Sequence, residues 1–197
     1  MTAHGFALFD TSIGRCGIAW GARGISGVQL PEASEAKTRA RLARRYPQAR
    51  QAPPPGDVRR AIEAIVSLLN GERSDLSVVA LDMEDVAEFD RRVYEAARAI
   101  PAGATLSYGE LAARLGEAGL AREVGQALGR NPFPLIVPCH RVLAAGAKAG
   151  GFSANGGVAT KLALLTIERA RTSQAPTLFD EDPAFGLAVK PKARSGR

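Results

Sequence analysis

Residues 107–129 read SYGELAARLGEAGLAREVGQALG and carry the marks of two short helices around a tight turn. Ser107, followed three residues later by Glu110, is a capping-box pattern that indicates a helix start. Glycines bracket the turn, and a second helix is expected over Ala121–Gly129. The pair predicts a helix-turn-helix, whose second helix commonly enters a DNA groove, although such pairs also occur as plain packing units.

Helical patterning continues on both sides of this pair, over residues 85–171. A capping-box-like start at Asp85 predicts a helix that ends at Pro101, and an amphipathic helix is expected over Val158–Ala170. Between them, residues 131–138 contain three prolines, which predict a rigid extended segment. We therefore expect an all-α, winged-helix-like domain over residues 85–171.

Residues 1–84 have a different texture and predict a separate α/β domain with a small antiparallel sheet. Three short strands form a meander, at Phe6–Phe9, Cys16–Trp20 and Ile25–Leu30. Two helices follow, over Ser34–Tyr46 and, with Asp57 as its cap, to about Leu69, and a last short strand is expected at Ser77–Leu81. The polar residues 172–197 predict a disordered tail.

The composition is that of a folded chain, with 46% hydrophobic, 23% charged and 6% aromatic residues among 197. Its apolar runs are too short for the roughly 20 residues of a membrane span. The first five residues lack the features of a secretory signal. These observations predict a cytoplasmic protein that does not contact the membrane.

Basic residues outnumber acidic ones, which gives a net charge of +6 and permits an anionic partner. Much of the excess lies in one run, formed by Lys37, Arg39, Arg41, Arg44, Arg45 and Arg50. Such a run is more often a solvated helix face than a nucleic-acid-binding surface, and we interpret it as the former.

Two cysteines and two histidines are too few for a disulfide framework or a four-ligand zinc site. We therefore expect no metal and no cofactor. Cys16 is interpreted as a small apolar residue in a strand.

Cys139 stands beside His140 at the end of the proline-stiffened run, in the string Pro-Cys-His-Arg. The thiolate is the nucleophilic form of cysteine, so a reactive cysteine needs a base or positive surroundings. Adjacent side chains diverge, which makes a bridging water a better relay than a direct bond. Glu168 is the candidate carboxylate to orient the histidine. Taken alone, a Cys-His pair is more often structural than catalytic.

Ordered blocks of sequence change this balance. The blocks are Ser107–Ala112, Ala121–Pro132, Pro138–Val142 and Gly151–Ser153 with Lys161–Glu168. In order and spacing they resemble the O6-alkylguanine-DNA alkyltransferases, also called methylated-DNA–protein-cysteine methyltransferases. The resemblance covers about residues 85–170 and extends more loosely to the strands around Phe9 and Gly14. It implies a ribonuclease-H-like N-terminal domain.

The resemblance implies a specific chemistry, single-turnover repair of DNA. Cys139 would attack the O6-alkyl carbon and keep the alkyl group as a thioether, so that each molecule acts once. Tyr108 would donate a hydrogen bond from its hydroxyl to the base. His140 would act through water as the base with Glu168 behind it, and Lys161 would hydrogen-bond near the substrate oxygen.

The resemblance also implies that the target nucleotide is rotated out of the duplex. Arg122 would enter the vacated stack, and the small residues Ala121 and Gly125 would allow close approach to the minor groove. Arg130 and Arg141 would contact phosphates, although Arg141 could equally brace the fold.

The pocket for the alkyl group is expected from neighbouring segments. Asn131 would tie the turn before the active-site segment, while Pro134, Phe152 and Ser153 would line the pocket. Phe152 replaces a tyrosine that is frequent in the family, Glu123 adds a negative charge to the DNA-facing helix, and Asp90 stands where glutamine is usual.

We therefore expect a monomer that acts on double-stranded DNA containing O6-alkylguanine, with adducts on thymine O4 left open. One alternative is a helix-turn-helix regulator in which Cys139 is structural or a sensor, and another is a cysteine hydrolase. Residues Gln174–Phe179 resemble peptides that dock on sliding clamps, the competing interpretation being an ordinary frayed tail.

Overall fold

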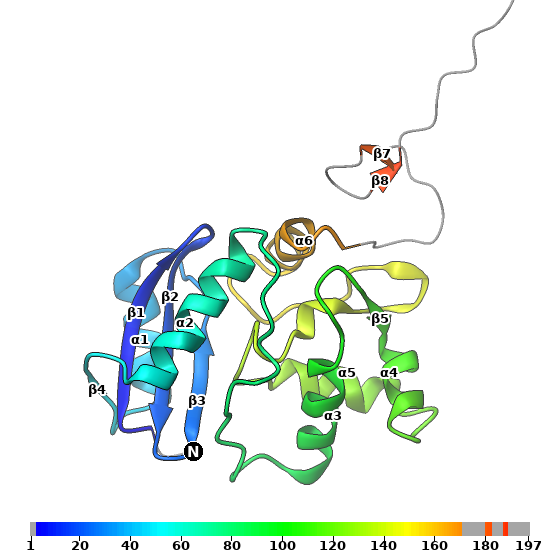
Figure 1. Ribbon diagram of the computed structural model, residues 1–197. Helices are drawn as coiled ribbons and strands as arrows, with labels where there is room; N and C mark the ends of the chain where they lie inside the picture. The colour runs from blue at the N-terminus through cyan, green and yellow to red at the C-terminus, as the bar shows by residue number, and fades with distance from the viewer. Residues whose placement is uncertain (1–2, 171–179, 183–186, 189–197) are drawn as a thin grey trace, which may run out of the picture.

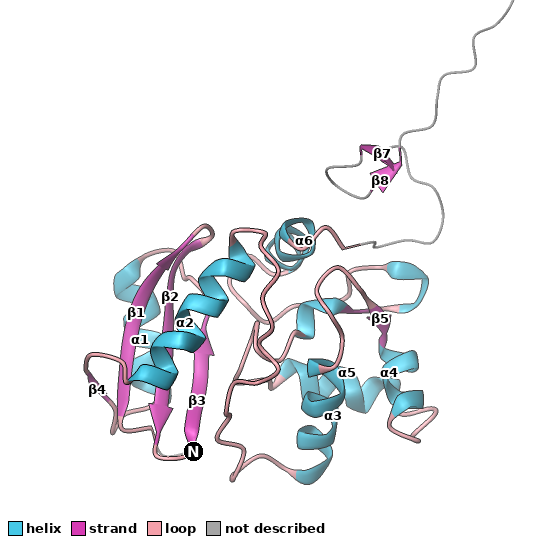
Figure 2. Cartoon of the chain, in the orientation of Figure 1, coloured by secondary structure: helices cyan, strands magenta, loops and turns pink. Residues whose placement is uncertain are grey.

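The computed structural model describes residues 3–170, 180–182 and 187–188. Figure 1 shows two halves side by side, a sheet with two helices and a group of helices, and Figure 2 shows how strands and helices separate between them. The strands are β1 (Gly5–Thr11), β2 (Gly14–Gly21), β3 (Gly24–Gln29), β4 (Arg50–Gln51), β5 (Leu106–Ser107), β6 (Val142–Leu143), β7 (Asp180–Asp182) and β8 (Leu187–Ala188). The helices are α1 (Glu35–Arg45), α2 (Gly56–Leu69), α3 (Glu88–Arg98), α4 (Tyr108–Arg114), α5 (Ala121–Gly129) and α6 (Val158–Ile167), with short 3-10 turns η1 (Cys139–Arg141) and η2 (Ala145–Ala147).

The N-terminal sheet has the order β3-β2-β1-β4. The three predicted strands form the expected antiparallel meander, with Phe9 opposite Cys16. The prediction of a purely antiparallel sheet is wrong, because β4 pairs with β1 in parallel and makes the sheet mixed. The short β4 belongs to the chain between two predicted helices, where apolar alternation gives no signal.

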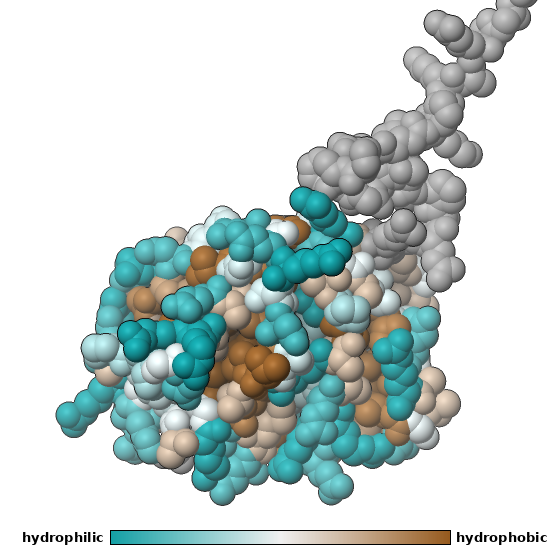
Figure 3. All heavy atoms as spheres, viewed as in Figure 1, coloured by the Kyte–Doolittle hydropathy of each residue, from teal (hydrophilic) through white to brown (hydrophobic). Residues whose placement is uncertain are grey.

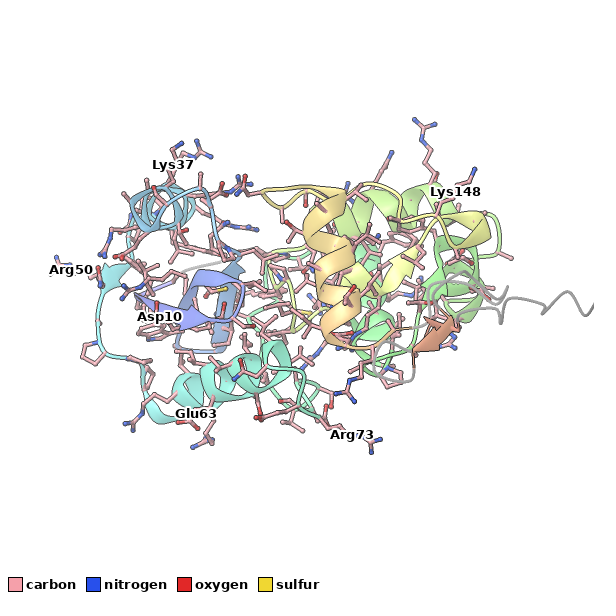
Figure 4. The ribbon with its side chains drawn as sticks, turned by 90° about the horizontal axis from the view of Figure 1, so that it is seen from above. Asp10, Lys37, Arg50, Glu63, Arg73 and Lys148 are labelled. Carbon is pink, nitrogen blue, oxygen red and sulfur yellow. The ribbon has the colours of Figure 1, made fainter. Side chains whose placement is uncertain are left out.

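Alternation along the strands buries both faces of this sheet. Phe6 packs in a small cluster with Leu42 of α1, while Ala7, the next residue, packs in the main core with Ile65 of α2. Successive side chains of a strand point to opposite faces, so α1 and α2 cover opposite sides. Figure 4 shows this sandwich from above.

Two helix starts and one strand differ from the prediction. Asp57 does not cap α2, which begins at Gly56 after Pro55, and α3 begins at Glu88 rather than at Asp85. The predicted strand 77–81 is reduced to an isolated bridge between Ile25 and Leu81. Here the backbone of Ala80 lies very close to Gly24. A Cβ on Gly24 would be 2.5 Å from the carbonyl oxygen of Ala80, so only glycine fits at this position.

The predicted helix-turn-helix is present as α4 and α5, which pack against α3. Ser107 and Glu110 form the predicted capping box at the start of α4. The second half is not wholly helical, because β5 and β6 form a two-residue parallel ladder. Helix α6 ends at Ile167, three residues before the predicted end, and Arg169 with φ +53° takes the left-handed conformation that terminates it.

The two halves share one continuous hydrophobic core that runs from strand residues such as Ile18 to helix residues such as Val124. A backbone hydrogen bond from Val28 N to Pro132 O (2.9 Å) joins the edge strand β3 to the segment before Cys139. The domain boundary at residues 84/85 stays a prediction. The sheet half therefore supports the backbone that carries the cysteine.

Polar side chains cover most of the face in Figure 3, with a smaller apolar area near its middle. Across the described ranges, no helix combines the length and apolar character needed to cross a membrane. Strands β7 and β8 pair antiparallel, which the sequence did not predict. The rest of the predicted tail, including Gln174–Phe179, lies outside the described residues.

Candidate active site

The segment before Cys139 is held in shape by Asn131. Its side-chain Nδ2 donates to Val137 O (2.8 Å), and its Oδ1 accepts from Phe133 N (2.8 Å). Leu135 within this loop has φ +74°, an uncommon left-handed conformation for a branched side chain. The amide thus ties both ends of a tight loop, which fixes where the following cysteine begins its 3-10 turn.

Cys139 opens into a pocket of about 490 Å³. The pocket gathers residues from α4, α5, η1 and the loop before α6, and its lining is Tyr108, Ala121, Arg122, Gly125, Leu128, Gly129, Cys139, Gly151, Phe152 and Ser153. The thiol and the second helix of the helix-turn-helix therefore line one cavity. A ligand held by that helix can reach the sulfur.

His140 is buried directly behind the thiol turn and faces the end of α6. Its Nε2 lies 2.9 Å from Glu168 Oε1, and both side chains are almost fully buried. A carboxylate accepts a hydrogen bond, so Nε2 carries the proton in the neutral imidazole and Nδ1 keeps the lone pair. No partner for Nδ1 occurs among the described residues. Nδ1 is consequently the nitrogen that can accept a proton.

The pKa values of this pair support a neutral histidine beside a charged carboxylate. Burial lowers the pKa of His140 below 6.5, and the hydrogen bond to Glu168 only partly offsets this. Burial raises the pKa of Glu168, but hydrogen bonds from His140 and Arg141 outweigh it and bring the value to about 2. The imidazole is thus poised as a base and the carboxylate as its permanent acceptor.

The thiol itself is protonated at rest. Burial raises the pKa of Cys139, while a hydrogen bond with Asn131 and the positive charge of Lys161 act in the opposite direction. Activation by a base is therefore needed before the sulfur can act as a nucleophile.

Lys161 is fully buried rather than solvated. Its Nζ donates to Val142 O (2.6 Å) and lies 5.8 Å from the ring centroid of Tyr108. Burial lowers its pKa, and burial raises that of Tyr108, which keeps the phenol protonated as a donor. Lys161 is not among the residues that line the pocket. Its ammonium group is bonded to the backbone of β6 instead.

Of the two roles left open for Arg141, the structure shows the bracing one. Arg141 is buried and donates from Nε and Nη2 to Glu168 (2.8 Å each) and from Nη1 to Ile100 O (2.5 Å). Three of the five N–H donors of this buried guanidinium are therefore used inside the protein. The structure favours the bracing role, and the phosphate contact of Arg141 stays a prediction.

Arg130 is exposed but paired. It forms a two-point ion pair with Asp90 (2.9 and 2.8 Å), which ties the end of α5 to the start of α3. Asp90 is thus a residue that holds the second helix in place. In the sequence, the only sign of this role is that aspartate stands at position 90 where the family usually has glutamine.

Not every expected pocket residue lines the pocket. Pro134 does not, because it forms a bridge with Val137 inside the tight loop. Leu128, Gly129 and Gly151 do line it, and no sequence pattern pointed to them as pocket residues. All three stand inside the family blocks, next to residues that were chosen for their side chains.

This fold and site define a helix-turn-helix protein whose second helix shares a pocket with a cysteine that stands next to a buried histidine–glutamate pair. Residues 88–170 match the family described as 6-O-methylguanine DNA methyltransferase, DNA binding domain. A methylated-DNA–protein-cysteine methyltransferase of Methanothermobacter thermautotrophicus is 36% identical over 152 residues, which cover 77% of this chain and 78% of that protein. This chain therefore belongs to the methylated-DNA–protein-cysteine methyltransferase family.

Other relatives and solved structures agree. A Mycobacterium tuberculosis protein of the same name is 42% identical over 128 residues, covering 65% of this chain and 75% of the relative. The crystal structure of Mycobacterium tuberculosis OGT in complex with DNA superposes with a TM-score of 0.65 at 34% identity, covering 83% and 91% of the two chains. The O6-methylguanine DNA methyltransferase structure from Methanococcus jannaschii gives 0.60 at 28% identity, covering 83% and 93%.

Proposed function

We propose that this protein repairs duplex DNA by moving the alkyl group of O6-alkylguanine to its own Cys139 in a single turnover. One observation carries the proposal: Cys139 and the α5 residues Ala121, Arg122 and Gly125 line the same pocket. A helix that binds DNA beside a nucleophile in a cavity suits a reaction on a base removed from the stack.

The transfer is a displacement at the alkyl carbon. A bond forms between that carbon and Cys139 Sγ while the carbon–O6 bond breaks, and the thiol proton passes through water to His140 Nδ1. Glu168 stabilises the resulting imidazolium through Nε2, as the short contact between them supports. The leaving guanine gains negative charge, which the hydroxyl of Tyr108 stabilises by donating a hydrogen bond until the base takes up a proton from water. No cofactor takes part in this scheme.

On the DNA side, Arg122 is exposed at the start of α5 and lines the pocket, which suits a side chain that replaces the extruded base in the stack. Gly125 permits close approach, and Arg130 keeps an exposed guanidinium beside its ion pair for a phosphate. Phe152 and Ser153 form the wall for the alkyl group. Lys161 keeps a positive charge near the thiol.

We further propose a cytoplasmic monomer, since reduced thiols persist in that compartment. The two halves would correspond to a ribonuclease-H-like domain and a winged-helix-like domain. The free thiol lines the pocket beside α5 as well as packing against the core, and this access to the pocket favours the transfer reaction over the regulator alternative.

Intact-protein mass spectrometry after exposure to methylated and benzylated duplexes tests the proposal. The expected result is one methyl or one benzyl group per molecule, located on Cys139 by peptide mapping and absent in Cys139→Ala. DNA binding without any mass gain would identify a regulator instead. Repeated turnover of an ester or amide would identify a hydrolase.

A further inference from the structure

Helix α1 carries a large excess of positive charge that the proposed reaction does not use. It contains five basic residues and one acidic residue over eleven positions. Helix α2, on the opposite side of the same sheet, contains two of each over fourteen. Like charges spaced along one helix repel each other, so this concentration costs stability unless an anionic partner offsets it.

Two of these basic side chains, Lys37 and Arg44, face outward on α1. Thr38 and Leu42 mark the buried face of α1. Lys37 and Arg44, seven residues apart, point in nearly the same direction, well away from that face. Among the described residues no hydrogen bond or ion pair involves either of these two side chains. We refer to Lys37 and Arg44 as the α1 cationic pair.

Other arginines of α1 are already engaged, which sets the pair apart. Arg39 forms an ion pair with Glu35 (2.7 Å), and Arg41 forms one with Glu32 (2.9 Å). The acidic groups near this helix are therefore used on its flanks. The outward face keeps its charge for solvent or for a partner.

Lys37 of the pair lies on the same edge of the molecule as Lys148, which precedes the pocket-lining Gly151. In Figure 4, Lys37 and Lys148 project from one edge, while Glu63 of α2 and Arg73 project from the opposite edge. Lys148 stands three residues before Gly151, which lines the cavity, and a Cβ built on Gly150 would lie 3.5 Å from the ring of Tyr108. A polyanion at the pocket mouth could therefore continue along the face of α1.

We propose that the α1 cationic pair is a second DNA-binding surface, which contacts backbone phosphates of the duplex flanking the damaged base. This rests on the proposed function insofar as DNA is the partner. Seven residues of helix span about 10 Å, about three times the 3.4 Å rise of successive phosphates on one strand. Flexible cations at this spacing hold a backbone without reading sequence, which a lesion scanner requires. This proposal competes with the solvated-face interpretation of the basic run.

The test compares two variants with the same charge change. Lys37→Gln/Arg44→Gln removes the pair, and Arg59→Gln/Arg60→Gln removes two exposed arginines of α2 on the far side of the sheet. Affinity for an undamaged duplex is measured from about 50 to 200 mM salt. Each lost phosphate contact lowers the slope of log K against log salt by about 0.9.

We expect the α1 variant to lower the slope by about 1.8, so that wild-type protein loses about 12-fold more affinity than the variant over this range. The α2 variant should keep the wild-type slope. Equal slopes for the two variants, whether both reduced or both unchanged, would overturn the proposal, because the effect would then be general or absent.

A second measurement separates this proposal from the proposed function. Both variants should alkylate Cys139 with free O6-benzylguanine at the wild-type rate, since this substrate makes no phosphate contacts. If the salt slope falls in the α1 variant as expected but the wild-type protein is not alkylated, only the proposed repair reaction is refuted. If the wild-type protein is alkylated but the salt slope is the same in both variants as in the wild type, only the second DNA-binding surface is refuted.

Discussion

Glu168→Gln removes one charge from the centre of the buried network while nearly preserving shape. In the wild type, Glu168 accepts hydrogen bonds from His140 and, twice, from Arg141. Glutamine offers a single acceptor oxygen, and its NH₂ group would face donors. The variant therefore leaves the buried Arg141 cation without its counter-charge and frees the histidine to change tautomer.

The size of the effect follows from the pKa of Glu168. Its fall from 4.5 to about 2 corresponds to about 3 kcal/mol of stability at neutral pH. A depressed carboxylate pKa contributes stability above the unfolded value of 4.5, and this contribution is lost as pH falls through about 2. Removal of one partner from a buried ion pair costs about 3–5 kcal/mol, in agreement. In a chain of this size the melting temperature should fall by roughly 6–12 °C.

Urea unfolding at pH 7 measures the loss, with the exposed Glu63→Gln as the matched control, for which we expect a change within about 0.5 kcal/mol. Alkylation by free O6-benzylguanine should also slow, because the base loses its fixed tautomer. A Glu168→Gln protein that unfolds and reacts like the wild type would refute the network as both brace and relay.

Other predictions address the nucleophile, the DNA contact, the base and the helix start. Cys139→Ala should abolish alkyl transfer and retain DNA binding, with residual mass gain as the contradicting result. Arg122→Ala should slow repair of a duplex more than reaction with free O6-alkylguanine in single-turnover assays; equal losses would contradict base extrusion. Because burial lowers the pKa of His140, the alkylation rate should fall with a midpoint below pH 6.5 as acid protonates the base, and a midpoint above that value would exclude the assignment. Ser107→Ala should cost about 0.5–2 kcal/mol in thermal unfolding by removing the capping box, and a neutral effect would show that β5 alone fixes this helix start.

Patterns with a local cause were predicted well from the sequence. The capping box at Ser107 is satisfied within four residues, and the meander over 5–29 follows from alternation and glycine turns. Features that depend on distant partners were not predictable in this way. The parallel pairing of β4 and the reduction of the strand at 77–81 to one bridge depend on where other strands lie.

The site divides along the same line. The sequence identified the residues that meet at the pocket, such as Tyr108 and Cys139, because the family blocks carry them. It left Arg141 between two roles, since only the fold reveals that this cation is buried against Glu168 and the carbonyl of Ile100, just after α3. The pairing of Asp90 with Arg130 spans 40 positions, and a single substitution cannot indicate its partner.

The protonated state of Cys139 suits a protein that is consumed by its own reaction. A thiolate that formed freely at neutral pH would react with any electrophile or oxidant, and each such event would remove one molecule from repair. Burial raises the pKa of this thiol, while its base stands one residue away and is neutral. Cys16 shows the same physics without a base, since burial in a strand raises its pKa to about 12 and no histidine adjoins it in the sequence. We therefore expect the pocket and the His140–Glu168 pair, not the sulfur's own acidity, to decide which of the two cysteines reacts.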